Sequence, residues 1–197
     1  MTHREHPAVF VDRDGTLIED VGYLSSVEQI KLIPKATEAL KILKSCGYKI
    51  IVVSNQSGVA RGYFDEAMVQ TIHREVLKIF SGNGALIDGI YYCPHHPGYG
   101  SAPYRKACDC RKPAPGMILQ AQIEHNLSLP NSFIIGDKRT DIVTGKNLNI
   151  PAILVLTGYG KEEQAKIMRD GNPEPDFIAD DIYQAALWIK KNTNRKP

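Results

Sequence analysis

Long hydrophobic runs are absent from this 197-residue chain, and no stretch approaches the ~18 apolar residues that a membrane span needs. The amino-terminal segment Met-Thr-His-Arg-Glu-His-Pro is polar and lacks the apolar core of a secretory signal peptide. An excess of one charge is also missing, since the formal net charge of +2 is too small to indicate a nucleic-acid-binding or membrane-surface protein. We therefore expect a cytoplasmic protein that binds neither nucleic acid nor membrane.

Cysteine is scarce and unevenly placed. Of four cysteines, Cys93, Cys108 and Cys110 fall within one segment, while Cys46 stands alone in a helix-like stretch. A disulfide scaffold would spread its pairs across a small secreted chain, which argues against such a fold here. Cys46 is most simply a small core residue, and we assign it no role.

Repeats, linkers and low-complexity blocks are also lacking, and what remains is an alternation of short apolar runs with longer amphipathic stretches. This alternation is typical of βαβ units around a parallel sheet, and the length fits one domain, residues 1–197. We predict strands at 8–11, 49–53, 89–92, 133–135, 152–156 and 177–179. We predict helices at 35–45, from an N-cap at Asp65 to about residue 80, after Pro115, between 135 and 152, and at 182–190, with a frayed tail at 192–197.

Two carboxylates, Asp12 and Asp14, follow the first predicted strand in the sequence DRDGTL. Ligands of parallel α/β sheets bind beyond the carboxyl ends of the strands, so both side chains are expected to face the crevice there. One carboxylate could attack phosphorus and hold Mg²⁺, while the other could protonate a leaving oxygen. Taken alone, the pair would more simply be a turn or helix-capping motif.

Polar groups at later strand ends favour the catalytic interpretation. Ser54 and Asn55 follow the second strand and could bind phosphoryl oxygens, and Lys112 could neutralise the charge of the transferring group. Asp137 and Asp141 follow the fourth strand and offer the carboxylate oxygens that Mg²⁺ prefers. Each element is weak evidence by itself, but their order at successive strand ends predicts a phosphoryl-transfer site.

The segment 93–112 has little periodicity and contains a second cluster of reactive side chains. It holds the motifs Cys-Pro-His-His-Pro and Cys-Asp-Cys, whose three thiols and one imidazole make a closed ligand set for structural zinc. The spacing is tighter than the usual Cys-x-x-Cys, and residue chemistry alone does not choose between His95 and His96. Three unrelated reduced cysteines are the simpler but less favoured alternative.

The four strand-end motifs resemble those of the haloacid dehalogenase superfamily of phosphotransferases, which implies a Rossmann-like parallel sheet with helices on both faces. By that resemblance Asp12 is the nucleophile and Asp14 the general acid and base, while Ser54 and Lys112 stabilise the phosphoryl group. Magnesium is expected at the Asp12 carboxylate, the Asp14 backbone carbonyl and Asp137. Mn²⁺ suits the same oxygen ligands.

Residues 8–158 resemble the heptose-1,7-bisphosphate phosphatases, most closely at 10–17, 54–62, 91–97, 108–113 and 136–138. The resemblance implies a minimal cap, hydrolysis of the 7-phosphate, and a product used for nucleotide-activated heptose of cell-surface polysaccharide such as lipopolysaccharide. It implies zinc ligands Cys93, His95, Cys108 and Cys110. The substrate-binding residues it implies are Asp20, Val21, Gly22, Tyr23, Ser54, Asn55, Gln56, Ser57, Arg111, Lys112 and Lys138.

The fourth motif departs from the family, because residues 141–146 replace a more alanine-rich helix start while sparing Asp137 and Lys138. Asp141 is expected to brace the site rather than to bind the metal. Zinc at Cys110 is expected to hold Arg111 and Lys112 over the phosphate crevice, with no open coordination position for a substrate.

Other interpretations stay open at this point. Histidinol-phosphate phosphatase is a close relative with the same catalytic motifs and a similar cysteine-rich loop. A non-catalytic zinc-binding interaction module is a different class, although such a protein would be expected to have lost one of its catalytic residues. Arg61, between the glycines of the 58–62 segment, is a candidate aid to an anionic substrate. A monomer is the expected state for a single small domain.

Overall fold

A computed structural model describes residues 5–171 and 173–193. Its strands are β1 (Ala8–Val11), β2 (Lys49–Asn55), β3 (Gly89–Cys93), β4 (Phe133–Gly136), β5 (Ala152–Val155) and β6 (Phe177–Ala179). Its α-helices are α1 (Ala36–Ser45), α2 (Glu66–Gly82), α3 (Gly116–His125), α4 (Arg139–Asn147), α5 (Gly160–Asp170) and α6 (Ile182–Thr193). Two 3-10 helices, η1 (Val27–Gln29) and η2 (Leu129–Asn131), complete the elements of the described residues.

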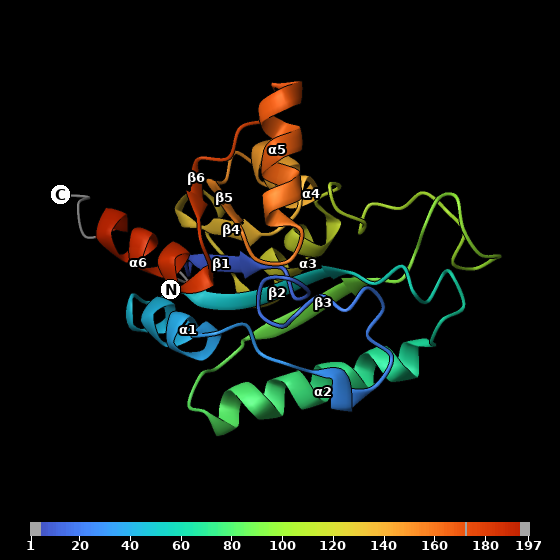
Figure 1. The fold of residues 1–197 in the computed structure, drawn as a ribbon. Helices are drawn as coiled ribbons and strands as arrows, with labels where there is room; N and C mark the ends of the chain where they lie inside the picture. The colour runs from blue at the N-terminus through green and yellow to red at the C-terminus, as the bar shows by residue number, and fades with distance from the viewer. Residues whose placement is uncertain (1–4, 172, 194–197) are drawn as a thin grey trace.

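The six strands form one sheet in the order β3-β2-β1-β4-β5-β6, and every neighbouring pair is parallel (Figure 1). The chain first builds outward from β1 to β3 and then returns to the other side of β1 with β4. The strand order therefore reverses beside β1, which is where doubly wound sheets open a ligand crevice. The α/β fold with a parallel sheet, predicted from the alternating pattern, is confirmed.

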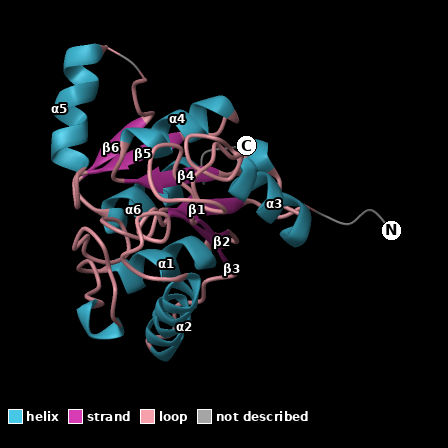
Figure 2. Ribbon diagram, turned by 90° about the vertical axis from the view of Figure 1, so that its right-hand side faces the viewer, coloured by secondary structure: helices cyan, strands magenta, loops and turns pink. Residues whose placement is uncertain are grey.

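Helices cover both faces of the sheet (Figure 2). Alternate strand residues such as Val9 and Val11 pack with α1, α2 and α6, while Ala8 and Phe10 pack with α3, α4 and α5. Since both faces are buried, the strands are near-continuous apolar runs rather than alternating ones. The central strand β1 is buried along its whole length. It therefore holds the residue that directly follows it, Asp12, in a defined position at the edge of the sheet.

Most predicted elements are present, with shifted ends. Asp65 caps α2 as predicted, since its Oδ1 accepts a hydrogen bond of 2.8 Å from the Met68 N–H. The prediction that β2 stops at residue 53 is wrong, because Ser54 and Asn55 continue the pairing with β3. The frayed tail is also wrong at 192–193, which belong to α6, and its residues 194–197 lie outside the described part of the chain.

The connection between β3 and α3 is the longest segment without helix or strand in the described residues. Residues 93–112, here called the Cys/His loop, start at the last residue of β3 and project from the carboxyl end of the sheet beside the loop that follows β2 (Figure 1). In residues 5–171 and 173–193, no helix combines the length and the apolar character that crossing a membrane requires.

Candidate active site

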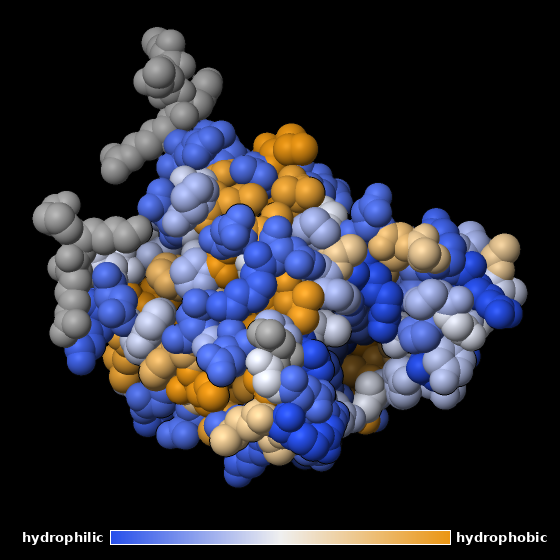
Figure 3. Space-filling model, turned by 90° about the horizontal axis from the view of Figure 1, so that it is seen from above, coloured by the Kyte–Doolittle hydropathy of each residue, from blue (hydrophilic) through white to orange (hydrophobic). Residues whose placement is uncertain are grey.

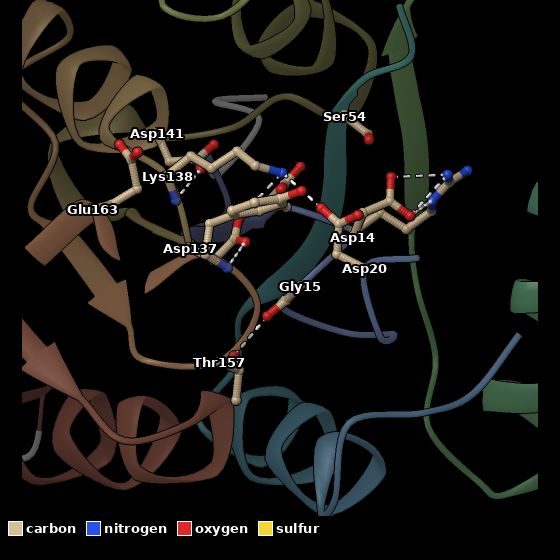
Figure 4. Close-up of polar contacts among 12 residues, drawn as sticks. Asp14, Gly15, Asp20, Ser54, Asp137, Lys138, Asp141, Thr157 and Glu163 are labelled. Atoms are coloured by element: carbon tan, nitrogen blue, oxygen red, sulfur yellow. Dashed lines mark hydrogen bonds and ion pairs between the residues drawn. The ribbon is translucent and has the colours of Figure 1, made fainter. Parts of the chain in front are cut away.

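Three neighbouring strand ends deliver the polar side chains of the site. Asp12 directly follows β1, Ser54 lies in the last part of β2, and Asp137 directly follows β4. Because these strands are adjacent and parallel, their carboxyl ends meet at one edge of the sheet. Figure 4 shows the side chains of Asp14, Ser54, Asp137 and Lys138 lying around this edge.

The ammonium group of Lys112 is the centre of the site. Its Nζ lies 2.7 Å from Asp12 Oδ1 and 2.6 Å from Asp141 Oδ1, and it donates a third hydrogen bond of 2.7 Å to the Val53 carbonyl. The lysine is only 4% exposed. Burial alone would lower the pKa of Lys112, but the two carboxylates outweigh it and raise the pKa, so the group stays cationic.

Asp137 is fully buried, and its two carboxylate oxygens have different surroundings. Its Oδ2 accepts a hydrogen bond of 2.9 Å from the Tyr159 N–H, whereas its Oδ1 has no hydrogen-bond partner among the described residues and lies 3.9 Å from Lys138 Nζ. Burial, with the charge of Asp12, raises the pKa of Asp137 to about 8. A buried carboxylate oxygen that accepts no hydrogen bond suits a hard divalent cation.

The candidate metal ligands lie close together, since oxygens of Asp12, Asp137 and Asp141 fall within 4.8 Å of one another. Asp141 is already occupied, because its Oδ1 pairs with Lys112 and its Oδ2 accepts a hydrogen bond of 3.2 Å from the Lys138 N–H. Asp12 and Asp137 therefore fit Mg²⁺ better than Asp141 does. The expected bracing role of Asp141 agrees with this geometry.

Gly15 allows the backbone of the turn after β1 to lie next to the Asp137 side chain. Its φ is +82°, in the left-handed region that favours glycine, and a Cβ there would collide with the Asp137 carboxylate and approach Gly158. The Gly15 carbonyl also accepts a hydrogen bond of 2.6 Å from Thr157 Oγ1 (Figure 4). The turn at Gly15 can thus pass next to the Asp137 carboxylate because glycine has no side chain.

Asp14 is held by two residues rather than left mobile in the crevice. The guanidinium of Arg13 pairs with both of its oxygens, with Nη2 at 3.0 Å from Oδ1 and 2.9 Å from Oδ2. Gln56 Nε2 donates to Asp14 Oδ2 and to Ser54 Oγ, each at 2.8 Å. Sequence reasoning missed Arg13, which is 1% exposed, although its place between two aspartates is a signal that could have been used.

A cavity of about 320 Å³ opens beside this centre, and most of the predicted substrate residues line it. The predicted substrate residues in its wall are Asp20, Gly22, Tyr23, Asn55, Gln56, Ser57, Arg111 and Lys138. Ser54 and Lys112 instead line a smaller adjoining cavity of about 30 Å³, together with Asp12 and Asp14. Val21 lines neither cavity and is 45% exposed.

Lys138 connects the cavity to the catalytic centre. Its Nζ pairs with Asp20 Oδ2 at 2.9 Å and lies 4.8 Å from the centroid of the Tyr159 ring. Burial would lower the pKa of Lys138, but the charges of Asp12, Asp137 and Asp20 outweigh it and raise the pKa. The wall of the cavity therefore carries a fixed positive charge that suits an anionic substrate.

The thiols of the Cys/His loop converge on one point. Cys110 Sγ lies 3.2 Å from Cys93 Sγ, 3.3 Å from Cys108 Sγ and 3.3 Å from His95 Nδ1, and all three cysteines are free thiols. The neighbouring His96 is turned away, since its Nδ1 accepts a hydrogen bond of 3.0 Å from the Gly98 N–H. These four side chains fit a closed tetrahedral zinc site, and the geometry favours His95.

Asn55 ties the end of this loop to the sheet. Its Nδ2 donates to the Lys112 carbonyl and its Oδ1 accepts from the Lys112 N–H, both at 3.0 Å. Asn55 lines the cavity, but both ends of its amide are engaged with the backbone of Lys112. The lysine is thereby positioned by β2 on one side and by the thiol cluster, two residues earlier, on the other.

Comparison with known proteins decides the family. A protein from Pasteurella multocida named D-glycero-beta-D-manno-heptose-1,7-bisphosphate 7-phosphatase is 41% identical over 184 residues, covering 93% of this chain and 96% of the relative. The chain belongs to the heptose-1,7-bisphosphate phosphatase family. A relative of the same name from Escherichia coli K12 is 40% identical over 186 residues, covering 94% of each chain.

Two further findings agree with the heptose-1,7-bisphosphate phosphatase family. A family model described as HAD-hydrolase-like matches residues 109–185. The crystal structure of the D,D-heptose 1,7-bisphosphate phosphatase from B. bronchiseptica, complexed with magnesium and phosphate, has a TM-score of 0.83 and 27% identity, covering 94% of this chain and 99% of that one. This chain is thus a phosphoric monoester hydrolase of the haloacid dehalogenase superfamily, as its motifs predicted.

Proposed function

We propose that this chain is a magnesium-dependent phosphatase that removes the 7-phosphate of D-glycero-β-D-manno-heptose 1,7-bisphosphate. The observation that supports the chemistry best is the buried group of Asp12, Lys112 and Asp137, in which Asp137 Oδ1 accepts no hydrogen bond among the described residues. The substrate and its anomer are proposed from the names of relatives at 41% and 44% identity. The cavity of about 320 Å³ is of the size expected for a small-molecule site.

Asp12 is proposed as the nucleophile. Its ion pair with Lys112 fixes the carboxylate at the floor of the smaller cavity, where the phosphoryl group would enter. An oxygen of Asp12 forms a bond to phosphorus while the bond between phosphorus and the sugar oxygen breaks, which yields an aspartyl phosphate. Lys112 and the Ser54 hydroxyl then face the phosphoryl oxygens, where a fixed cation and donor lower the barrier.

Asp14 is proposed to move the protons. It gives a proton to the departing sugar oxygen, and then takes one from the water that attacks the aspartyl phosphate. That attack breaks the bond to Asp12 and releases inorganic phosphate. Arg13 and Gln56 orient the carboxylate of Asp14 for both steps through their hydrogen bonds.

The proposed metals have separate tasks. Asp12, the Asp14 carbonyl and Asp137 would hold Mg²⁺, which supplies positive charge next to the transferring phosphoryl group. Cys93, His95, Cys108 and Cys110 would hold zinc, which is structural here because a fourfold protein ligand set leaves no open position. The zinc loop would then fix Arg111 and Lys112 at the cavity.

The proposal includes a biological setting. The product would serve nucleotide-activated heptose biosynthesis for cell-surface polysaccharide. We propose a cytoplasmic location, since the cysteines are all unpaired and free thiols persist in reducing compartments. We further propose a single catalytic domain, residues 1–197, that acts as a monomer.

The test is phosphate release with Mg²⁺ from both anomers of the heptose bisphosphate and from histidinol phosphate. Wild-type protein is run beside Asp12→Asn, which keeps the shape of the side chain but removes the nucleophile. We expect a kcat/KM advantage of about a hundredfold for the β anomer, equivalent to ~2.7 kcal/mol, and loss of turnover in the variant.

Other outcomes point to other functions. Preference for histidinol phosphate would retain the mechanism but replace the substrate. Phosphate release that is unchanged by Asp12→Asn would remove the aspartyl-phosphate mechanism. No turnover of any of the three esters would favour a zinc-binding interaction module on this fold.

A further inference from the structure

Three loops that are far apart in the sequence surround the mouth of the 320 Å³ cavity. They are the flap (residues 20–24), the rim loop (residues 57–64) and the Cys/His loop. The surface is hollowed between the body of the molecule and the part that projects from it (Figure 3). Among the described residues no separate cap domain covers this mouth, so the contacts between the loops decide how firmly it is shaped.

Arg61 of the rim loop lies between the other two loops. Its guanidinium carbon is 3.5 Å from the ring centroid of Tyr99 in the Cys/His loop and 5.8 Å from that of Tyr23 in the flap. Its Nε is buried without a hydrogen-bond partner among the described residues. A guanidinium stacks well on aromatic faces, so these contacts are cation–π interactions.

Further ring contacts extend the group at both ends. Tyr23 packs edge to face against Tyr63 with centroids 4.5 Å apart, and Tyr99 packs against His96 at 4.6 Å. The five side chains form a continuous row that begins at Tyr63 of the rim loop, passes Tyr23 of the flap and Arg61 of the rim loop, and ends in the Cys/His loop. We call this row the aromatic clasp, with members Tyr23, Arg61, Tyr63, His96 and Tyr99.

The backbones of the rim and Cys/His loops also meet at the clasp. Gly100 has a φ of +82°, and a Cβ on it would collide with the carbonyl of Ala60, the residue before Arg61. The stacking of Tyr99 on Arg61 is therefore supported by a close backbone approach one residue away. The flap has no comparable backbone contact to these loops among the described residues, and its attachment depends more on the side chains.

The geometry points to Arg61 as a positioning residue that holds the flap against the Cys/His loop and so sets affinity for the sugar part of the substrate. Arg61 is not in the wall of the cavity, whereas its partner Tyr23 is, together with Asp20 of the same flap. Arg61 therefore acts through the flap rather than by binding a phosphate itself. The effect on substrate affinity rests on the proposed function, whereas the attachment of the flap does not.

The flap can be examined without any substrate. Arg61→Met keeps the length of the side chain but removes the planar cation, and Arg74→Met on the exposed face of α2 is the matched control. We expect hydrogen exchange of the backbone amides at 20–24 to become about tenfold faster in Arg61→Met and to stay unchanged in Arg74→Met. Equal exchange in all three proteins would overturn the clasp.

Kinetics separate the clasp from an anion-binding role. We expect Arg61→Met and Tyr99→Leu each to raise KM for the heptose bisphosphate about tenfold, with kcat/KM for p-nitrophenyl phosphate within twofold of wild type. Because both changes break one stack, the double variant should be little worse than either single one. A normal KM in Tyr99→Leu beside a raised KM in Arg61→Met would instead make Arg61 an anion ligand and refute the inference.

The two proposals fail in different ways. If wild-type protein does not hydrolyse the heptose bisphosphate, the proposed function fails, and the exchange rates of residues 20–24 alone decide the clasp. If it does hydrolyse that substrate while exchange and KM are unchanged in Arg61→Met, the clasp fails and the proposed function stands.

Discussion

Asp141 is the residue whose replacement should separate catalysis from stability. Burial raises the pKa of Asp141 to about 6 even though Lys112 is beside it, whereas the ordinary value is 3.8. A raised carboxyl pKa means that folding stability falls as the pH rises from 3.8 through about 6. At pH 7.5 the ionised Asp141 therefore costs folding free energy, and Asn in its place removes that cost while still accepting the hydrogen bond from the Lys138 N–H.

The expected effect on activity has the opposite sense. Asp141→Asn removes one charge-assisted hydrogen bond to Lys112, which is worth about 1.5–3 kcal/mol. If that energy positions Lys112 for phosphoryl transfer, kcat/KM with saturating Mg²⁺ should fall about tenfold to a hundredfold. The melting temperature should stay within ~2 °C of wild type, because the loss of the hydrogen bond and the relief of the buried charge offset each other.

Asp88 provides a matched control at the other end of β2. It accepts hydrogen bonds from Lys44 at 2.8 Å, from Lys49 at 3.0 Å and from the Ile50 N–H at 2.8 Å. Burial would raise the pKa of Asp88, but these donors outweigh it and lower the pKa, so the ionised form stabilises the fold. Asp88→Asn should therefore cost about 1–2 kcal/mol, or ~3–6 °C in Tm, and leave kcat/KM unchanged.

Asp141→Asn should thus lower kcat/KM and leave Tm nearly unchanged, whereas Asp88→Asn should lower Tm and leave kcat/KM unchanged. The reasoning is refuted if Asp141→Asn lowers Tm as much as Asp88→Asn does while its kcat/KM matches wild type. In that case the Asp141 carboxylate would stabilise the amino-terminal end of α4 and would have no part in positioning Lys112.

Two further predictions follow from the same site. Gly15→Ala should lower Tm by several degrees and reduce turnover more than tenfold, because a Cβ at φ +82° meets the Asp137 carboxylate; unchanged thermal unfolding and kinetics would contradict this. Cys108→Ser should release bound zinc in a metal-binding dye assay and lower kcat/KM, because the cluster anchors the chain two residues before Lys112. Cys46→Ser, outside the cluster, is the control and should leave zinc content at one per chain.

The fold was accessible from the sequence because each strand is a short apolar run buried on both faces. β1 ends at Val11, directly before Asp12, as the apolar run predicted. β2 was predicted two residues too short, because Ser54 and Asn55 are polar and look like a turn. Their strand conformation comes from pairing with Tyr92 and Cys93 of β3, a long-range contact that local pattern does not contain.

The site was only partly accessible for the same reason. Arg13 is a charged residue that composition places at the surface, yet it is buried because Asp14 satisfies its charge. The choice between His95 and His96 depends on where Cys108 and Cys110 lie, thirteen to fifteen residues later in the chain. The aromatic clasp was hidden as well, since its members come from three separate loops.

The hydrogen bonds between Asn55 and the backbone of Lys112 divide the Cys/His loop into two parts with different freedom to change. The last residues of the loop are held against β2 by these two hydrogen bonds. An insertion between them and the thiol cluster would therefore move Lys112. The middle of the loop, between His95 and Cys108, is attached to the rim loop where Tyr99 stacks on Arg61 and Gly100 approaches Ala60, and its other positions have more freedom to vary in composition. Substitutions in the middle of the loop could therefore change which phosphorylated substrate is accepted during evolution. The residues at the strand ends, which face the phosphate, would keep their positions.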